Sequence, residues 1–126
     1  MTRARETGPG KIHEMANLDF LRGLADRRSV VFVERLPGLR VPTRATLVRL
    51  RRNQVEQMNE LTLELNGDTE LASVLGQVCA RGECLERMTI APPDYAAMVE
   101  LRKLMVARID GPRGDGSISV YFNFRS

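Results

Sequence analysis

The sequence contains a single histidine, His13, in a segment with little apolar content. Histidine is the commonest proton acceptor in enzymes, and Ser-His-Asp sets, Cys-His sets and the H-E-x-x-H zinc motif all need it on a rigid element. The glycine-containing strings GPGK and GPRGDG also lack the spacing of a phosphate-binding loop. We therefore predict a protein that is not an enzyme and has no catalytic residues.

Cysteine is nearly as scarce, because Cys79 and Cys84 are the only two and four residues separate them. A structural zinc site needs four cysteine or histidine ligands, and the one histidine is distant in sequence. The sequence therefore predicts no metal and no cofactor. We interpret the two cysteines as reduced, partly buried thiols, with a redox pair as the alternative.

Long hydrophobic runs are missing as well. No run approaches the ~20 apolar residues that a membrane-spanning helix requires. The N-terminal string MTRARETGPGKIHEM has no apolar stretch of the kind found in secretory signals. These absences predict a cytoplasmic protein with no membrane partner.

What is present is the composition of an ordinary globular domain. The chain has 126 residues, of which 43% are hydrophobic and 28% charged, and a chain of this size can bury about two-thirds of its unfolded surface in one core. Gly8, Pro9 and Gly10 interrupt the first part of the chain. We expect residues 1–14 to form a flexible basic arm and residues 15–126 to form a single domain.

Two segments combine apolar residues at helical spacing with capping signals. Residues 17–28 begin at Asn17, a favourable N-cap. In residues 68–82, Asp68 and Thr69 are both candidate N-caps, and the segment ends with a glycine. Both segments are predicted to be helices.

Two further segments show a helical pattern. In residues 42–59, Thr43 follows a proline as a candidate N-cap, and the leucines and the methionine fall within one stripe. Residues 95–109 place apolar residues at helical spacing among strong helix formers. The intervening residues 83–94 show no regular pattern. We predict helices for 42–59 and 95–109 and irregular structure between 83 and 94.

Strand signals are confined to short segments. Residues 29–36 are rich in β-branched and aromatic side chains, and residues 117–124 alternate apolar with polar ones. In residues 60–66, leucines alternate with polar residues but also continue the helical stripe, so both structures fit. The predicted fold class is α+β: three to four helices packed on a small, mostly antiparallel sheet of the first two segments, joined by 60–66 if the alternation holds.

The charge distribution is uneven in the middle of the chain. Residues 35–52 carry six arginines and no acid, whereas residues 53–70 carry five acids and no base. In the first turn of a helix, arginines oppose the helix dipole at a cost of a few tenths to ~1 kcal/mol each unless an anion offsets them. The alternative is a solvated face on which Arg52 pairs with Glu56. The six arginines are Arg35, Arg40, Arg44, Arg49, Arg51 and Arg52.

Two hypotheses of function follow. The first is a non-enzymatic binding or regulatory protein whose six arginines contact an anionic partner, most simply a nucleic-acid backbone, since the segment has no aromatic side chains on which bases could stack. The second is a protein-only adaptor or structural subunit of a bacterial or phage-like assembly. In that case copies would associate through complementary basic and acidic halves or through edge strands, because two strands alone make a poor sheet. A protein partner or a homo-oligomer is expected from the second hypothesis.

Overall fold

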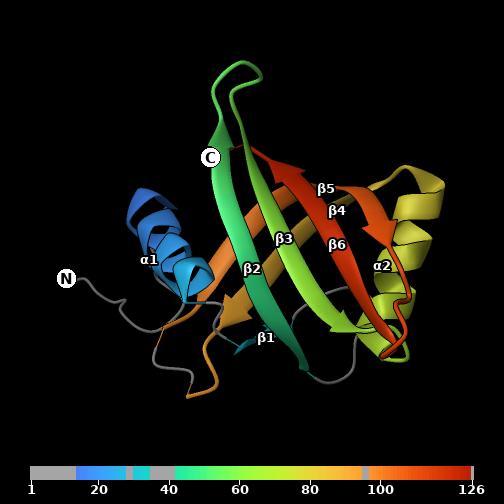
Figure 1. The fold of residues 1–126 in the computed structure, drawn as a ribbon. Coiled ribbons are helices and arrows are strands. Elements are labelled where there is room, and N and C mark those ends of the chain that lie inside the picture. Colours follow the sequence, from blue (N-terminus) through green and yellow to red (C-terminus); the bar gives the residue numbers. More distant parts are fainter. Residues whose placement is uncertain (1–13, 28–29, 35–41, 95–96, 126) are drawn as a thin grey trace.

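Six strands and two helices make up the described part of the chain in the computed structural model, which covers residues 14–27, 30–34, 42–94 and 97–125. All strand pairs are antiparallel, and the order β1-β2-β3-β6-β5-β4 closes into a barrel because β1 pairs with both β2 and β4 (Figure 1). The elements are α1 (Glu14–Asp26), β1 (Val30–Glu34), β2 (Thr43–Asn53), β3 (Met58–Asn66), α2 (Glu70–Arg81), β4 (Cys84–Ala91), β5 (Val99–Asp110) and β6 (Ser117–Phe124).

The predicted α+β class, with three to four helices on a small sheet, is wrong. The described residues are mostly sheet, with only two helices. The helices predicted for 17–28 and 68–82 are confirmed as α1 and α2. The helix predicted for 42–59 is wrong, because those residues form β2 and the turn that follows it. The helix predicted for 95–109 is also wrong, since β5 occupies most of that range.

Two β-bulges explain why these strands carry a helix-like pattern. The pairing register shifts between Leu47 and Arg49 in β2, and between Val106 and Arg108 in β5. A bulge adds one residue to a strand, so neighbouring inward positions lie three residues apart instead of two. Mixed spacings of two and three imitate the period of an amphipathic helix. The bulge of β2 separates the buried Leu47 from the buried Leu50, and the bulge of β5 separates the buried Val106 from the partly buried Ile109. A second spacing of three in β5, between Leu101 and Leu104, coincides with the positive φ of Lys103, 54°.

The strands predicted for residues 29–36 and 117–124 are confirmed. Residues 29–36 and 117–124 contain β1 and β6, and the ambiguous residues 60–66 lie within β3. Residues 83–94, expected to be irregular, contain β4. The buried positions of β4 again change spacing, from three residues between Leu85 and Met88 to two between Met88 and Ile90.

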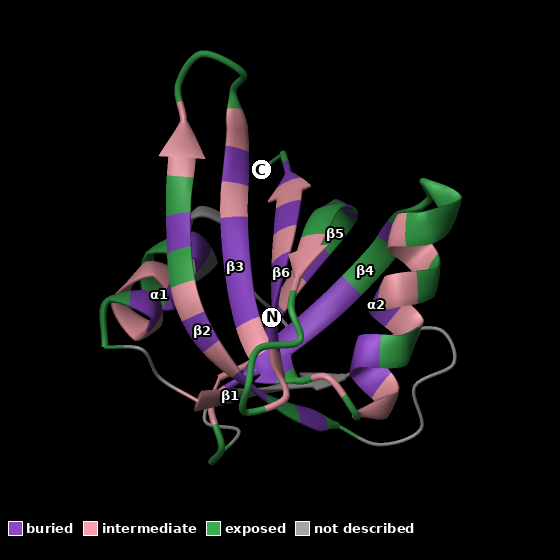
Figure 2. Cartoon of the chain, turned by 45° about the vertical axis from the view of Figure 1, so that its right-hand side comes forward, coloured by how far each residue is buried: buried purple, intermediate pink, exposed green. Residues whose placement is uncertain are grey.

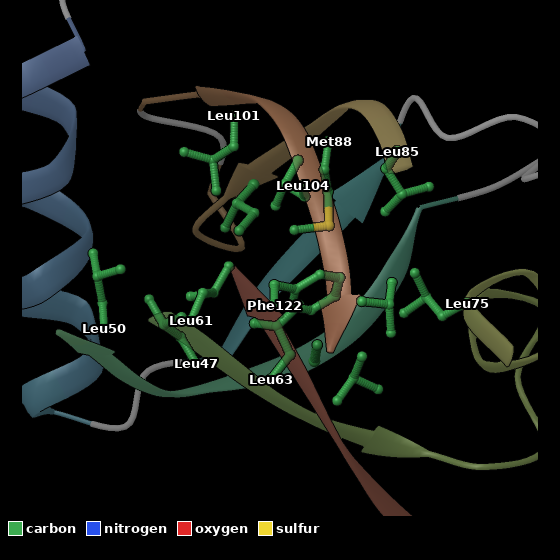
Figure 3. Close-up of a cluster of buried hydrophobic side chains, with 14 of the residues drawn as sticks. Leu47, Leu50, Leu61, Leu63, Leu75, Leu85, Met88, Leu101, Leu104 and Phe122 are labelled. Atoms are coloured by element: carbon green, nitrogen blue, oxygen red, sulfur yellow. The ribbon is translucent and has the colours of Figure 1, made fainter. Parts of the chain in front are cut away.

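Leucine and phenylalanine side chains fill the barrel, and the two helices lie at opposite sides of it (Figure 2). α1 packs against β2 and β5, which are not neighbours in the sheet, so it covers an open end of the barrel. In the core, Leu50 lies beside α1, whereas Leu75 of α2 lies at the far side of the cluster around Phe122 (Figure 3). The barrel therefore has a single core that both helices complete.

The ends of α2 are fixed by specific caps. The Thr69 hydroxyl accepts a hydrogen bond from the Ala72 N–H at 3.2 Å, which makes Thr69 the N-cap rather than Asp68. Gly82 ends the helix in the left-handed conformation, with φ 65°, where a side chain is unfavourable. The chain then enters β4 directly.

The predicted arm, residues 1–14, lies almost entirely outside the described residues, apart from Glu14, where α1 begins. His13 also lies outside them. Neither described helix is long and apolar enough to span a membrane.

Candidate interaction surface

The opposite charges of the central segment face each other across the β2–β3 hairpin. Arg51 and Glu60 are paired in the register of the two strands, and the Arg51 Nε atom lies 2.6 Å from the Glu60 Oε1 atom. This hydrogen bond, followed by one from Asn53, lowers the pKa of Glu60 below its usual value. The described basic residues of the central segment lie in β2, and two of its acidic residues lie in the neighbouring β3. Opposite charges on adjacent strands attract each other across the sheet.

A second acid of β3 is paired in the same way. The Arg113 Nη2 atom lies 3.0 Å from the Glu64 Oε2 atom. Two of the five acids of residues 53–70, Glu60 and Glu64, are thus paired with arginines of the same chain. The helix N-terminus on which the anion-binding prediction partly rested is absent, because residues 43–53 are strand.

The six predicted arginines do not share one environment. Arg35 and Arg40 lie outside the described residues. Arg44 and Arg49 are exposed, and no described carboxylate lies within ion-pair distance of either. Arg51 is paired with Glu60, and the Arg52 Nη2 atom donates to the Gln57 Oε1 atom at 2.9 Å rather than pairing with Glu56. Whether these arginines contact an anion stays a prediction.

The outer face of the barrel brings Arg49 next to residues that were not identified from the sequence. Strand pairing places Arg49, Thr62, Tyr121 and Arg108 in one row across β2, β3, β6 and β5. This row crosses a depression of about 360 Å³. Arg108 was missed because its segment was expected to be a helix. Simple alternation from the buried Val106 would place Arg108 inward, and the bulge between the two residues places it outward.

Arg108 is held in place by two neighbours. Its guanidinium lies 4.1 Å from the centre of the Tyr121 ring, and its Nε atom lies 3.2 Å from an Asp110 carboxylate oxygen. Contact with Tyr121, and then the charge of Asp110, raise the pKa of Arg108 above its usual value. The side chain therefore carries its positive charge at neutral pH.

The turn between β2 and β3 forms a second exposed feature. The hairpin extends beyond the rest of the barrel, and its tip is exposed (Figures 1 and 2). Val55, at this tip, is 92% exposed, far more than Met105 at 47% or Phe20 at 38%, the other large apolar side chains exposed among the described residues. A single exposed apolar side chain is common on protein surfaces. The place of Val55 on a projecting turn, where a partner could reach it, makes it a candidate contact with another protein.

The two cysteines differ from each other. Cys79 is partly buried against the core, whereas Cys84 is exposed beside a cleft of about 450 Å³ between α2 and β4. They are not joined by a disulfide. The described residues also contain no cluster of three or more potential metal ligands.

Comparison with known proteins identifies the fold. At the sequence level, neither known protein families nor curated proteins give a match. Among solved structures, Hcp2 from Salmonella typhimurium superposes with a TM-score of 0.55 at 13% identity, over 75% of this chain and 80% of that one. The chain shares its fold with Hcp2. At this identity the similarity establishes the architecture alone.

Proposed function

We propose that the protein is a structural subunit that associates with copies of itself. The observation that carries this proposal is Val55, an apolar side chain 92% exposed at the end of a projecting hairpin. Fully burying a valine side chain stabilises a protein by roughly 1.5–3 kcal/mol. The isolated chain lacks this stabilisation because Val55 is exposed. In an assembly of identical chains, the same gain is repeated in every copy.

The hairpin tip has a defined conformation that favours this role. The Asn53 Oδ1 atom accepts a hydrogen bond from the Glu56 N–H at 3.1 Å, and the Gln57 Nε2 atom donates to the Gln54 carbonyl at 2.9 Å. Arg52 contacts Gln57 from the strand. A tip already held by these bonds loses less conformational entropy on binding than a flexible loop would.

The fold shared with Hcp2 establishes the architecture and does not itself assign a partner. Nothing in that similarity favours a nucleic-acid partner. Within the described part of β2 only Arg44 and Arg49 lack a carboxylate or amide partner, which is few for a nucleic-acid backbone, where affinity grows with the number of phosphates neutralised.

Sedimentation velocity of three forms tests the proposal: the natural chain, Val55→Asp and the control Val55→Ile. A charge placed in an apolar contact should shift the protein toward monomer, weakening association at least tenfold, whereas isoleucine should preserve the assembly. Because Val55 is exposed in the single chain, both variants should match the natural chain in thermal stability when all three are compared as monomers at low concentration. Equal association of Val55→Asp and the natural chain would contradict the role of the hairpin.

A further inference from the structure

The depression on the outer face of the barrel lies beside the two β-bulges, one in β2 and one in β5. The bulge of β2 lies next to Arg49 and the bulge of β5 next to Arg108, and both residues point away from the core. They stand at the two ends of the row that passes through Thr62 and Tyr121. Neighbouring strands lie about 4.8 Å apart. Arg49 on β2 and Arg108 on β5 therefore border the depression from its two opposite sides, with β3 and β6 between them.

The charges in this space leave one guanidinium uncompensated. Arg51 is neutralised by Glu60 and Arg108 by Asp110. Arg49 lines the same depression and makes no ion pair with a described carboxylate, although its charge contributes, after that of Arg51, to the lowered pKa of Glu60. Three arginines and two carboxylates thus leave a single positive charge. The site fits one negative charge, not a chain of phosphates.

The aromatic ring in the depression is already covered. Arg108 lies over Tyr121 at 4.1 Å from the ring centre, so a nucleic-acid base could not stack there without displacing it. Thr62 and Asn123 line the depression beside the ring and carry hydrogen-bonding side chains. These groups suit a small polar anion with a neighbouring amide, as in an acidic side chain on a peptide.

We propose that this depression binds a carboxylate side chain of an acidic peptide segment from a partner protein, with Arg49 as the main contact. The planar guanidinium matches a carboxylate in a two-pronged hydrogen bond. Arg108, held against Tyr121, forms the opposite wall. This site is separate from the hairpin tip and does not depend on self-association through Val55.

Nuclear magnetic resonance titration with acetyl-tetraglutamate-amide tests the site. The amide signals of Thr62, Tyr121 and Asn123 should shift in a saturable, salt-sensitive way, and the matching tetraglutamine peptide should cause no shift. Arg49→Gln should weaken binding roughly tenfold or more, as expected for loss of a charged hydrogen bond. Arg44→Gln is the matched control, because Arg44 is exposed and unpaired among the described residues on the same strand but does not line the depression.

Several results would overturn the inference. Equal weakening by Arg44→Gln would mean that the peptide senses only overall charge. Tighter binding of a single-stranded oligonucleotide of equal charge would assign the site to nucleic acid. A loss of native mass in Arg49→Gln, without peptide binding to the natural chain, would make another copy the occupant. Failure of the Val55 test would leave the peptide result unaffected, so the two proposals are separable.

Discussion

At the scale of single residues, the charge pattern has a local explanation. Arg52 and Glu56 suggested an ion pair one helical turn apart, but the pair that forms is Arg51 with Glu60, nine residues apart and opposite in the register of two strands. The signs of the charges were visible in the sequence. Their partners were not, because pairing depends on where the hairpin turns.

The Arg51–Glu60 pair predicts a pH dependence of stability. The pKa of Glu60 is lowered in the folded chain, so its stabilising contribution is present above the unfolded value near 4.5 and is lost as the pH falls through the lowered pKa. Because the Arg51 side chain is 62% exposed, we expect only a few tenths to ~1 kcal/mol. The difference in unfolding free energy between the natural chain and Glu60→Gln should therefore be largest at neutral pH and shrink in acid.

Urea unfolding at a series of pH values measures this difference. Glu56→Gln serves as the control, because Glu56 is exposed at the hairpin tip and makes no ion pair with the described residues. It should match the natural chain at every pH. If Glu60→Gln lost more stability in acid than at neutral pH, the assignment of this pair would be wrong.

At the scale of elements, the caps of α2 were easier to predict than the strands, whereas Asn17, predicted as the N-cap of the first helix, lies inside α1, which begins at Glu14. Helix α2 was recognised because Thr69 and Gly82 signal its ends through chemistry local to a few residues. β2 and β5 were mistaken for helices because each bulge moves the next inward residue by one position. A bulge depends on the partner strand, so a single segment does not reveal it.

The N-cap of α2 offers a direct test at this scale. Thr69→Ala removes the hydroxyl that accepts the Ala72 N–H and should lower the unfolding free energy by about 1 kcal/mol. Asp68→Ala, one residue earlier, should change it by no more than a few tenths, because the side chain of Asp68 does not cap the helix. Denaturant midpoints compare the two, and equal losses would contradict the assignment of Thr69.

At the scale of the whole molecule, the sequence indicated some of the strands but not their closure. The strands at 29–36 and 117–124 were identified, and a shortage of strands suggested that a second copy would complete the sheet. The chain instead supplies β2, β4 and β5 itself and closes a barrel. The candidate surface was therefore only half predicted: Arg49 was identified, whereas Arg108 and Tyr121 reached it through long-range strand pairing.

Self-association, the proposed central property of the protein, rests on the projecting hairpin and its exposed Val55. The most direct test is the native mass of the untagged natural chain, measured after nuclease treatment from low to high concentration. A self-associating subunit should show a native mass that is a defined multiple of the 14.2 kDa chain and that nuclease does not change. A mass that stays at 14.2 kDa throughout, or an assembly that falls apart when nucleic acid is removed, would contradict it.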